Sequence, residues 1–358
     1  MTTPHDVFGE RSLSGPPTKR AAYSDRTSLL MAEMSKLAYM KFEDPPDTDE
    51  ARKDELRQII ENIKGAADDG QAQNILASYV PTAPQSARER AKQDLRAKLA
   101  EGHFILVNTY VVGDTQAFLA ATDPDTIGPD EDGIAVLSFR GTESTEDWKT
   151  NLNAFKNIEN RVPVHSGFLE AFRLVQSEIR ADINNLSRVS IYITGHSLGG
   201  ALALIATKEI ADNSRGACYT FGQPRVAGFG YALSIKTPIY RVVNSRDIVP
   251  RIPPVFIPTV LTAIVSVAPI PYQKWIVKFL EKFTGYVHHG DMRYLTRTKN
   301  ERTNGYHDVR LLANPNMICR AFWWFKGVWR KPRSPIDDHS IDTYCKKLKA
   351  YALTRLNI

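Results

Sequence analysis

The stretch ITGHSLGGALALIA, residues 193–206, decides the fold of this chain. Its centre, GHSLG at 195–199, is a G-x-S-x-G pentad, a pattern that many chains contain by chance. The preceding SIYIT is β-branched and aromatic, which predicts a strand, and the small apolar residues after the pentad predict a tightly packed helix. A serine in such a strand–turn–helix bend is typical of a nucleophile, whereas a passive serine in a glycine-rich turn is the alternative. We therefore predict that Ser197 is a nucleophile at the edge of a sheet.

Segments on both sides of this bend fit the same architecture. We predict strands in HFILVNTYVV, TQAFLAATD, GIAVLSF, SIYIT, ACYTFG and PIYRVVN, with the first two paired through a turn at 113–114. We predict helices at 26–41, at about 167–184, after Leu198, and after His339. Apolar strands that alternate with helices predict an α/β fold, a mostly parallel sheet flanked by helices.

The domain organisation follows from composition. Residues 1–25 are rich in Pro, Gly, Ser and charge, which predicts a flexible tail. Residues 26–358 are expected to form one domain. A charged block at about 44–100 contains two surface-helix patterns, DELRQIIENIKGA and SARERAKQDLRAKLA, and predicts a helical insertion.

Composition also limits cofactors, partners and location. Three cysteines, at scattered positions, predict neither a disulfide framework nor a zinc site, and we expect no metal or organic cofactor. The net charge of +6 has no nucleic-acid motif beside it, so we expect no nucleic-acid partner, only weak attraction to anionic lipid. No signal peptide or spanning segment is evident, because the longest apolar run, 255–270, is short and contains two prolines. We expect a chain that is not integral to a membrane and is either cytoplasmic or exported without a cleavable signal.

A serine nucleophile needs a base and an orienting acid, which in this architecture follow it along the chain. Asp247 is the candidate acid, since it directly follows the strand IYRVVN in the proline-bounded loop NSRDIVPRIP. Four histidines follow the serine outside the pentad, and His339, ahead of an amphipathic helix, is modestly favoured as the base. His288 is the rival, with a structural role on an edge strand as its alternative. His196, inside the pentad, is expected to pack.

Seven blocks in order, from LLMAEMSKLAY at 29–39 to DDHSIDTY at 337–344, resemble the class 3 lipases, the fungal-lipase-like branch of the α/β-hydrolases. The others are VLSFRGTESTEDWKTNL, VHSGF, GHSLGGALA, TFGQPRVA with YRVVNSRDIVPRIP, and GYVHHGD. The resemblance implies the α/β-hydrolase fold and favours His339 over His288 as the base. It also implies an oxyanion hole from the backbone N–H groups of Thr142 and Leu198, to which the Thr142 hydroxyl adds a donor.

The resemblance further implies a lid at about 143–155. Trp148, Leu152 and Phe155 would lie on one face of a short helix over the site. The alternative is an ordinary amphipathic helix that packs on the core.

Two stretches depart from the family pattern. One is the apolar run 255–270 and the other is RAFWWFKGVWRKPR at 320–333, in which aromatic and basic residues alternate. Such stretches suit a membrane interface, and the equally weighted alternative is that they pack on the core.

The function expected is therefore a serine ester hydrolase on fatty-acyl esters of glycerolipids, a triacylglycerol lipase that forms an acyl-enzyme on Ser197. A phospholipase A-type enzyme on membrane phospholipids, including a toxin-like one, is the runner-up. A non-catalytic membrane-lipid-binding protein is the alternative of another class. The expected partners are a lipid ester substrate and, peripherally, a lipid interface or anionic membrane.

Overall fold

The computed structural model describes residues 22–41, 60, 61, 64, 65, 71, 87–113, 115–127, 132–141, 164, 166–211, 214–252, 274, 285–296, 306, 308–328 and 337–356. The chain divides into two compact units, one formed by Met1–Tyr39 with Ala97–Ile358 and the other by Met40–Arg96. Helix α5 (Ala87–Glu101) coincides with the second helix expected in the 44–100 insertion. The first falls largely outside the described residues, so the insertion stays a prediction.

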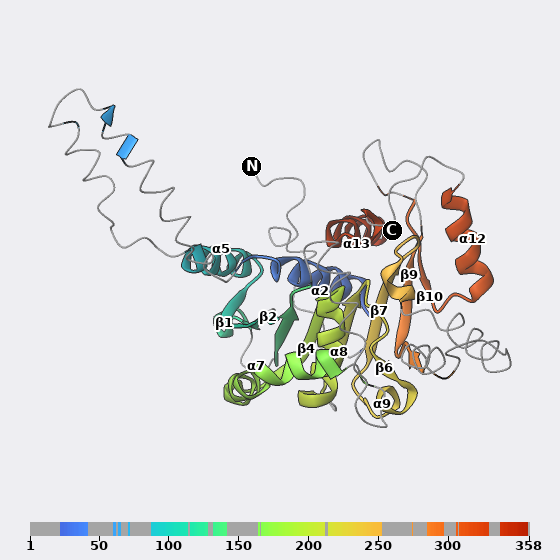
Figure 1. Ribbon diagram of the computed structural model, residues 1–358, viewed down its shortest axis with the longest axis horizontal. Coiled ribbons are helices and arrows are strands. Elements are labelled where there is room, and N and C mark those ends of the chain that lie inside the picture. The colour runs from blue at the N-terminus through green and yellow to red at the C-terminus, as the bar shows by residue number, and fades with distance from the viewer. Residues whose placement is uncertain are drawn as a thin grey trace. The chain divides into compact units, whose positions relative to one another are not determined.

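The larger unit contains an eight-stranded sheet in the order β1-β2-β3-β4-β5-β7-β9-β10 (Figure 1). Its strands are β1 (Phe104–Val112), β2 (Thr115–Thr122), β3 (Gly133–Phe139), β4 (Val189–His196), β5 (Cys218–Phe221), β7 (Ile239–Asn244), β9 (Asp291–Leu295) and β10 (Leu311–Ala313). Strands β3, β4, β5, β7 and β9 pair in parallel, and the pairs at both edges are antiparallel. The predicted α/β fold with a mostly parallel sheet is confirmed.

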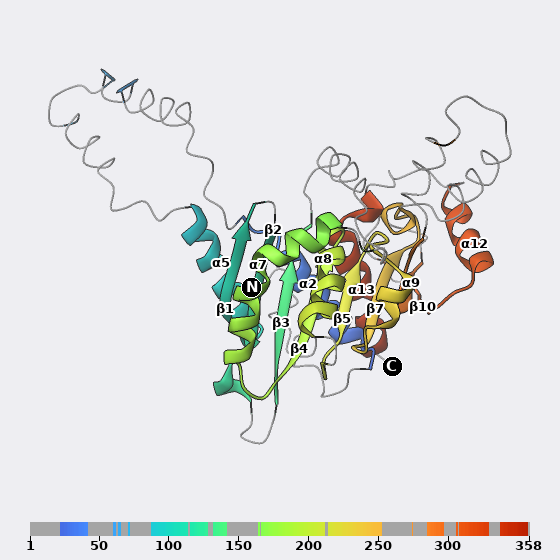
Figure 2. The ribbon, with the colours of Figure 1, turned by 60° about the horizontal axis from the view of Figure 1, so that its bottom comes forward.

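Helices cover both faces of this sheet (Figure 2). On one face lie α7 (Ser166–Asn185) and α8 (Leu198–Ile210), and on the other lie α2 (Asp25–Leu37) and α13 (Ile341–Leu356). The remaining elements are β6 (Ala227–Gly228), β8 (Tyr286–Val287), α9 (Phe229–Leu233), α12 (Met317–Val328) and the 3-10 turns η1 (Pro124–Thr126), η2 (Val249–Arg251) and η3 (Asp337–His339). Strands β6 and β8 form a separate antiparallel pair.

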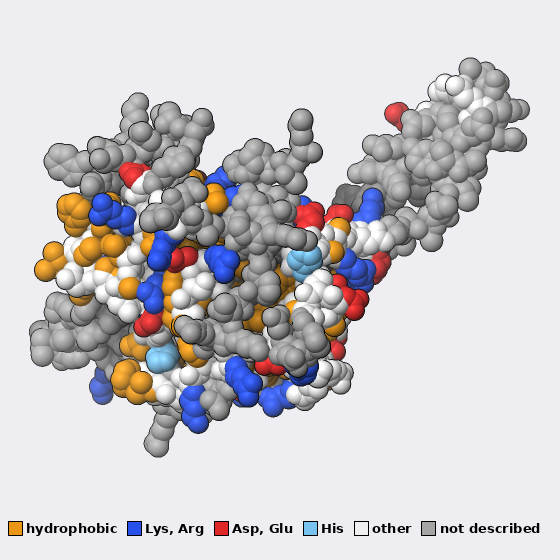
Figure 3. Space-filling model, turned by 180° about the vertical axis from the view of Figure 1, so that it is seen from behind, with side chains coloured by type: hydrophobic (Ala, Val, Ile, Leu, Met, Phe, Trp, Pro, Cys, Tyr) orange, Lys and Arg blue, Asp and Glu red, His pale blue; other side chains and the backbone are white. Residues whose placement is uncertain are grey.

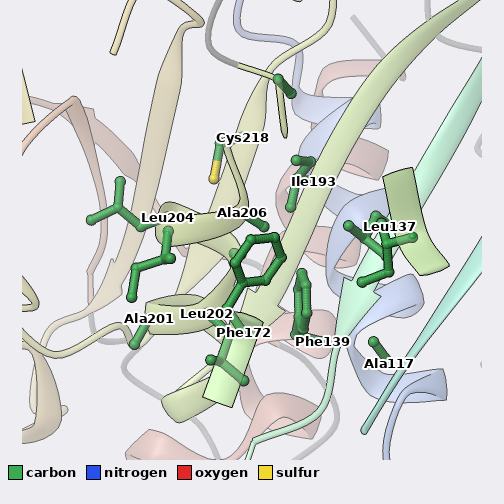
Figure 4. Packing of buried hydrophobic residues seen from close by; sticks show 14 of the residues in the cluster. Ala117, Leu137, Phe139, Phe172, Ile193, Ala201, Leu202, Leu204, Ala206 and Cys218 are labelled. Carbon is green, nitrogen blue, oxygen red and sulfur yellow. The ribbon is translucent and has the colours of Figure 1, made fainter. Parts of the chain in front are cut away.

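The core between the sheet and helices α7 and α8 follows the period-2 alternation of the strands. Alternate residues of β3, such as Leu137 and Phe139, face α7 and α8, as does Cys218 of β5 (Figure 4). Phe172 of α7 is fully buried, and its ring lies edge-on to that of Phe139, with centroids 6.1 Å apart. Because β3 is buried on both faces, its sequence GIAVLSF is almost continuously apolar.

The opposite face of the sheet is bonded to α2 partly through hydroxyl groups. Thr194 of β4 donates to the carbonyl of Met31, 3.1 Å away, and lies 2.8 Å from the hydroxyl of Ser35. Beside them, the ring of Tyr23 packs edge-on to Tyr240, with centroids 5.3 Å apart. Tyr23 was expected in a flexible tail, and for this residue that expectation is wrong, because its ring is covered by the aromatic side chains of the sheet.

Within the ranges described above, no helix combines the length and the apolar character that crossing a membrane requires.

We expect Phe172→Ala to lower the free energy of unfolding by about 3–5 kcal/mol, because it opens a cavity between α7 and the sheet. Leu174→Ala on the same helix is the matched control. Leu174 is 61% exposed, so its truncation should change the stability by no more than about 0.5 kcal/mol. Urea denaturation of both variants measures the difference, and equal losses would contradict this account of the core.

Candidate active site

Ser197 lies between the end of β4 and the start of α8, in a strained backbone conformation. Its φ and ψ are 57° and −122°, a region that side chains other than glycine rarely enter. The turn is so tight that a Cβ on Gly195 would lie 2.2 Å from the carbonyl oxygen of Gly199. The two glycines of the pentad therefore allow the bend that places the serine side chain beyond the strand.

The end of β3 packs directly against this bend. A Cβ on Gly199 would lie 2.3 Å from the carbonyl oxygen of Phe139, and one on Gly141 would lie 2.5 Å from that of His196. Leu198, the first residue of α8, presents its N–H at the N-terminal end of the helix, where a negative charge is stabilised. The other residue expected at the oxyanion hole, Thr142, directly follows Gly141 and lies outside the described residues.

In the structure, the three side chains predicted as nucleophile, base and acid lie next to one another. Ser197 Oγ lies 2.8 Å from His339 Nε2, and His339 Nδ1 lies 2.9 Å from Asp247 Oδ2. A carboxylate only accepts, so Nδ1 carries the proton and Nε2 accepts from the serine hydroxyl. The three residues come from the β4–α8 turn, the loop after β7 and the turn η3, so the fold joins segments that are far apart in the sequence.

The Asp247 carboxylate is fully buried and well bonded. It accepts from the backbone N–H of Val249 at 2.9 Å and from the hydroxyl of Tyr344 at 2.6 Å. Burial and, after it, the carboxylate raise the pKa of Tyr344, so the hydroxyl stays protonated and donates. Gly222, at φ +61°, makes room for the pair, because a Cβ there would lie 2.7 Å from Asp247 Oδ2 and 2.9 Å from His339 Cε1.

His196 bonds both its ring nitrogens rather than only packing, so the expectation of a packing role is incomplete. Its Nε2 donates to the backbone carbonyl of His339 at 2.6 Å, and its Nδ1 accepts from the hydroxyl of Tyr39 at 2.7 Å. Burial first, and the charge of His339 second, lower its pKa well below the usual value. A neutral His196 therefore fixes the backbone of the residue that approaches Ser197.

Asn244, at the end of β7, fixes the other side of the turn η3. Its side-chain N–H₂ group donates to the carbonyl of Asp338 at 2.8 Å, and its Oδ1 accepts from Lys347 Nζ at 2.7 Å. Its backbone N–H donates to the Tyr344 hydroxyl at 3.0 Å. Two consecutive carbonyls of η3 are thus each bonded by a side chain from a strand end.

His288, the rival base, lies elsewhere. Its Nε2 donates to the carbonyl of Pro250 at 2.6 Å, and burial, followed by the charges of Arg241 and Arg225, lowers its pKa well below the usual value. This is a structural histidine, although it follows β8 of the two-stranded sheet rather than lying on an edge strand of the main one.

The predicted lid lies outside the described residues, as does the apolar run 255–270. The lid residues Trp148, Leu152 and Phe155 are therefore still predictions. Among the residues that the structure describes, no cluster of three His, Cys, Asp or Glu side chains could hold a metal ion.

Comparison with known proteins finds matches to part of this chain. Residues 136–257, which contain the end of β3, the Ser197 turn and Asp247, match the family model of the class 3 lipases. Over this segment the chain is similar to the class 3 lipases. A lipase of Rhizomucor miehei is 34% identical over 161 residues, which are 40% of this chain and 42% of the relative. A chloroplastic phospholipase A(1), DAD1 of Arabidopsis thaliana, is 31% identical over 148 residues, 33% of each chain.

The chain thus spans less than half the length of those two relatives. Among solved structures, the crystal structure of a mono- and diacylglycerol lipase from Aspergillus oryzae superposes with a TM-score of 0.47 at 19% identity. That match covers 81% of this chain and 86% of the other.

The sequence did not indicate a role for several residues around Ser197. Tyr344 stands in the block DDHSIDTY without a predicted role, yet its position five residues after His339 on the docked α13 brings its hydroxyl to Asp247. Gly222 in TFGQPRVA and Asn244 before SRD were visible in the matched blocks, but nothing in their spacing indicates a role. Their contacts exist only in the folded chain.

The buried neutral His288 should make stability depend on pH. Below about pH 6.5 the unfolded chain gains a proton on this residue, whereas the folded chain does not until far lower pH. Stability should therefore fall as the pH drops below about 6.5, by about 1.4 kcal/mol per pH unit for such a histidine.

The side-chain amide of the His288→Gln variant can still donate to the carbonyl of Pro250. We expect the stability of this variant to fall less steeply than that of wild type as the pH drops below about 6.5, because the contribution of His288 is absent. Urea denaturation of wild type and variant between pH 7.5 and 5 would measure it. Parallel pH profiles of the two proteins would contradict the assignment.

Proposed function

We propose that this protein, like the class 3 lipases that residues 136–257 resemble, is a serine ester hydrolase that cleaves fatty-acyl esters of glycerolipids. The observation that carries the proposal is the chain of hydrogen bonds from Ser197 Oγ through His339 to Asp247, with contacts of 2.8 and 2.9 Å. This geometry has the nucleophile–base–acid order that activates a hydroxyl.

In the first step Ser197 Oγ attacks the ester carbonyl carbon. His339 Nε2 takes the hydroxyl proton as the bond forms, and the imidazolium is stabilised by the buried Asp247 carboxylate. Because Tyr344 and Val249 already bond that carboxylate, its orientation does not change during the reaction.

The negative charge on the carbonyl oxygen develops at the α8 N-terminus. We assign its binding to the backbone N–H of Leu198 and, from the resemblance, to the N–H and hydroxyl of Thr142. The support for Thr142 is that the residue before it in the sequence, Gly141, lies against the carbonyl of His196 and next to Ser197.

The tetrahedral intermediate then collapses and the acyl-enzyme is hydrolysed. His339 gives its proton to the departing alcohol, so the C–O bond breaks and an acyl ester remains on Ser197. Water, deprotonated by the same histidine, attacks this ester and releases the fatty acid. No cofactor is needed in this sequence of steps.

The substrate class is proposed as acylglycerol, with a phospholipid as the second candidate. The names of relatives support both, since they include a lipase and a phospholipase A(1). The basic, aromatic segment at 320–333 favours contact with a lipid interface in either case. A non-catalytic lipid-binding protein is the alternative of another class.

We expect Ser197→Ala to lower kcat at least about 10⁴-fold, because the variant lacks the hydroxyl that attacks the ester carbonyl. The measurement is hydrolysis of emulsified triacylglycerol and, separately, of anionic phospholipid vesicles. If the wild type cleaves only one of these substrates and the variant does not, that substrate identifies the protein as a lipase or a phospholipase. A fluorophosphonate should label the wild type and leave the variant unlabelled.

The matched control is Ser234→Ala, a surface hydroxyl after α9, which should keep wild-type activity. Activity that survives in Ser197→Ala would refute the serine mechanism. A wild type that cleaves neither ester and takes up no fluorophosphonate would favour the non-catalytic alternative.

Tyr344→Phe should lower kcat/KM by about 10- to 100-fold, the effect of removing one hydrogen bond to a charged group. The loss should appear in kcat rather than KM, because the hydroxyl positions Asp247 and does not contact substrate. Tyr231→Phe, which removes a hydroxyl bonded to Glu209, is the control and should stay within about twofold of wild type. Equal kinetics for the two variants would show that the Tyr344–Asp247 bond does not position the acid.

A further inference from the structure

Helix α12 exposes an apolar face to solvent. Met317, Ile318, Phe322 and Phe325 are 66%, 81%, 56% and 61% exposed, respectively. Their spacing of one, four and three residues places them along one side of the helix. A surface helix normally turns such a stripe towards the core, so this arrangement is the reverse of the usual one.

The exposure does not result from a detached helix, because the other side of α12 is docked. The guanidinium of Arg251 lies over the ring of Trp324, 3.8 Å from its centroid. The hydroxyl of Tyr294 lies 3.4 Å from the backbone carbonyl of Arg320. Since α12 is held through Trp324 and its backbone, the exposed stripe is available for a second contact.

The charged residues in α12 and directly after it in the sequence have one sign. Helix α12 contains Arg320 and Lys326 and no acidic residue, and the sequence after it continues with Arg330, Lys331 and Arg333. Figure 3 shows hydrophobic and basic side chains together at the left edge, the end of the molecule that α12 occupies in Figure 1. An anionic surface with an apolar interior complements both features, because cations meet the phosphates while rings and aliphatic chains enter below them.

We propose that the α12 face (Met317, Ile318, Phe322 and Phe325) docks the protein on an anionic phospholipid membrane. The occupant is a lipid surface rather than a second copy of the chain, because two copies would bring basic segments together. This inference deepens the proposed function, which supplies the reason for a lipid surface, but docking needs no turnover.

Docking through α12 would place the candidate active site beside the lipid. Arg251, which stacks on Trp324, lies four residues after Asp247 in the same loop. Tyr294, next to the carbonyl of Arg320, also lies 3.2 Å from the carbonyl of Ser245. The segment that carries the acid is therefore the segment on which α12 rests.

The test uses the full chain with Ser197→Ala, so that no lipid is consumed. Co-sedimentation compares vesicles of phosphatidylcholine alone with vesicles of equal phosphatidylcholine and phosphatidylglycerol. We expect binding to the anionic vesicles at least about tenfold tighter than to the neutral ones, and weaker binding as salt increases. Adding I318Q, F322Q and F325Q should weaken anionic binding at least about tenfold.

The matched control is L174Q with F229Q and L233Q, three apolar residues on α7 and α9 that are 61%, 66% and 58% exposed. It should bind like its parent. Three results would overturn the proposal: equal binding by the α12 and control variants, equal binding to both vesicle types, or a solution dimer that the α12 substitutions dissociate.

Hydrolysis of the soluble ester p-nitrophenyl butyrate, measured with Ser197 intact, separates docking from catalysis. The α12 variant should cleave it at the wild-type rate, which also shows that the variant is folded. Vesicle binding that depends on α12, in a chain that cleaves no ester, would support the docking face and refute the proposed hydrolase. A variant that loses both soluble-ester cleavage and vesicle binding would instead show a fold defect. The single substitution I318S, at the most exposed position of the α12 face, is then tested. It must reproduce the loss of binding for the proposal to stand.

Discussion

The close approach of three backbone segments around Ser197 is the constraint on which the rest of the site depends. The end of β3, the end of β4 and the first turn of α8 meet so closely that Gly141, Gly195 and Gly199 have no room for a Cβ. Ser197 itself is not a glycine, and its positive φ costs on the order of 1–3 kcal/mol. The packing of β3, β4 and α8 must offset that cost.

The two partners of Ser197, His339 and Asp247, lie in a 3-10 turn and a loop, and hydrogen bonds from other elements hold both in place. The carbonyls of Asp338 and His339 are bonded by side chains of Asn244 and His196, and the Asp247 carboxylate is bonded by Tyr344. Each bond joins a turn to a strand end or a buried helix. The imidazole of His339 is therefore positioned by the sheet, although it belongs to a short 3-10 turn.

Much of this arrangement could be predicted from the sequence, because period-2 and helical patterns report burial directly. The strands around the pentad, and Asp247 and His339 as partners of Ser197, followed from such patterns and from ordered motifs. The bonds of Tyr344, His196 and Asn244 could not be predicted, since they depend on which atoms face each other after packing. The tail prediction failed at Tyr23 because composition does not show where a ring will dock.

The pairing of α2 with α13 has a consequence for folding. Asp25 and Arg355, joined by a 2.8 Å ion pair, are 330 positions apart. Tyr39, two residues after α2, and Tyr344 of α13 reach the Ser197 region. Closing the chain over such a separation costs more entropy than closing a local turn. A chain in which α2 and α13 are not docked lacks the bonds from Tyr39 to His196 and from Tyr344 to Asp247, so its serine hydroxyl has no positioned base beside it.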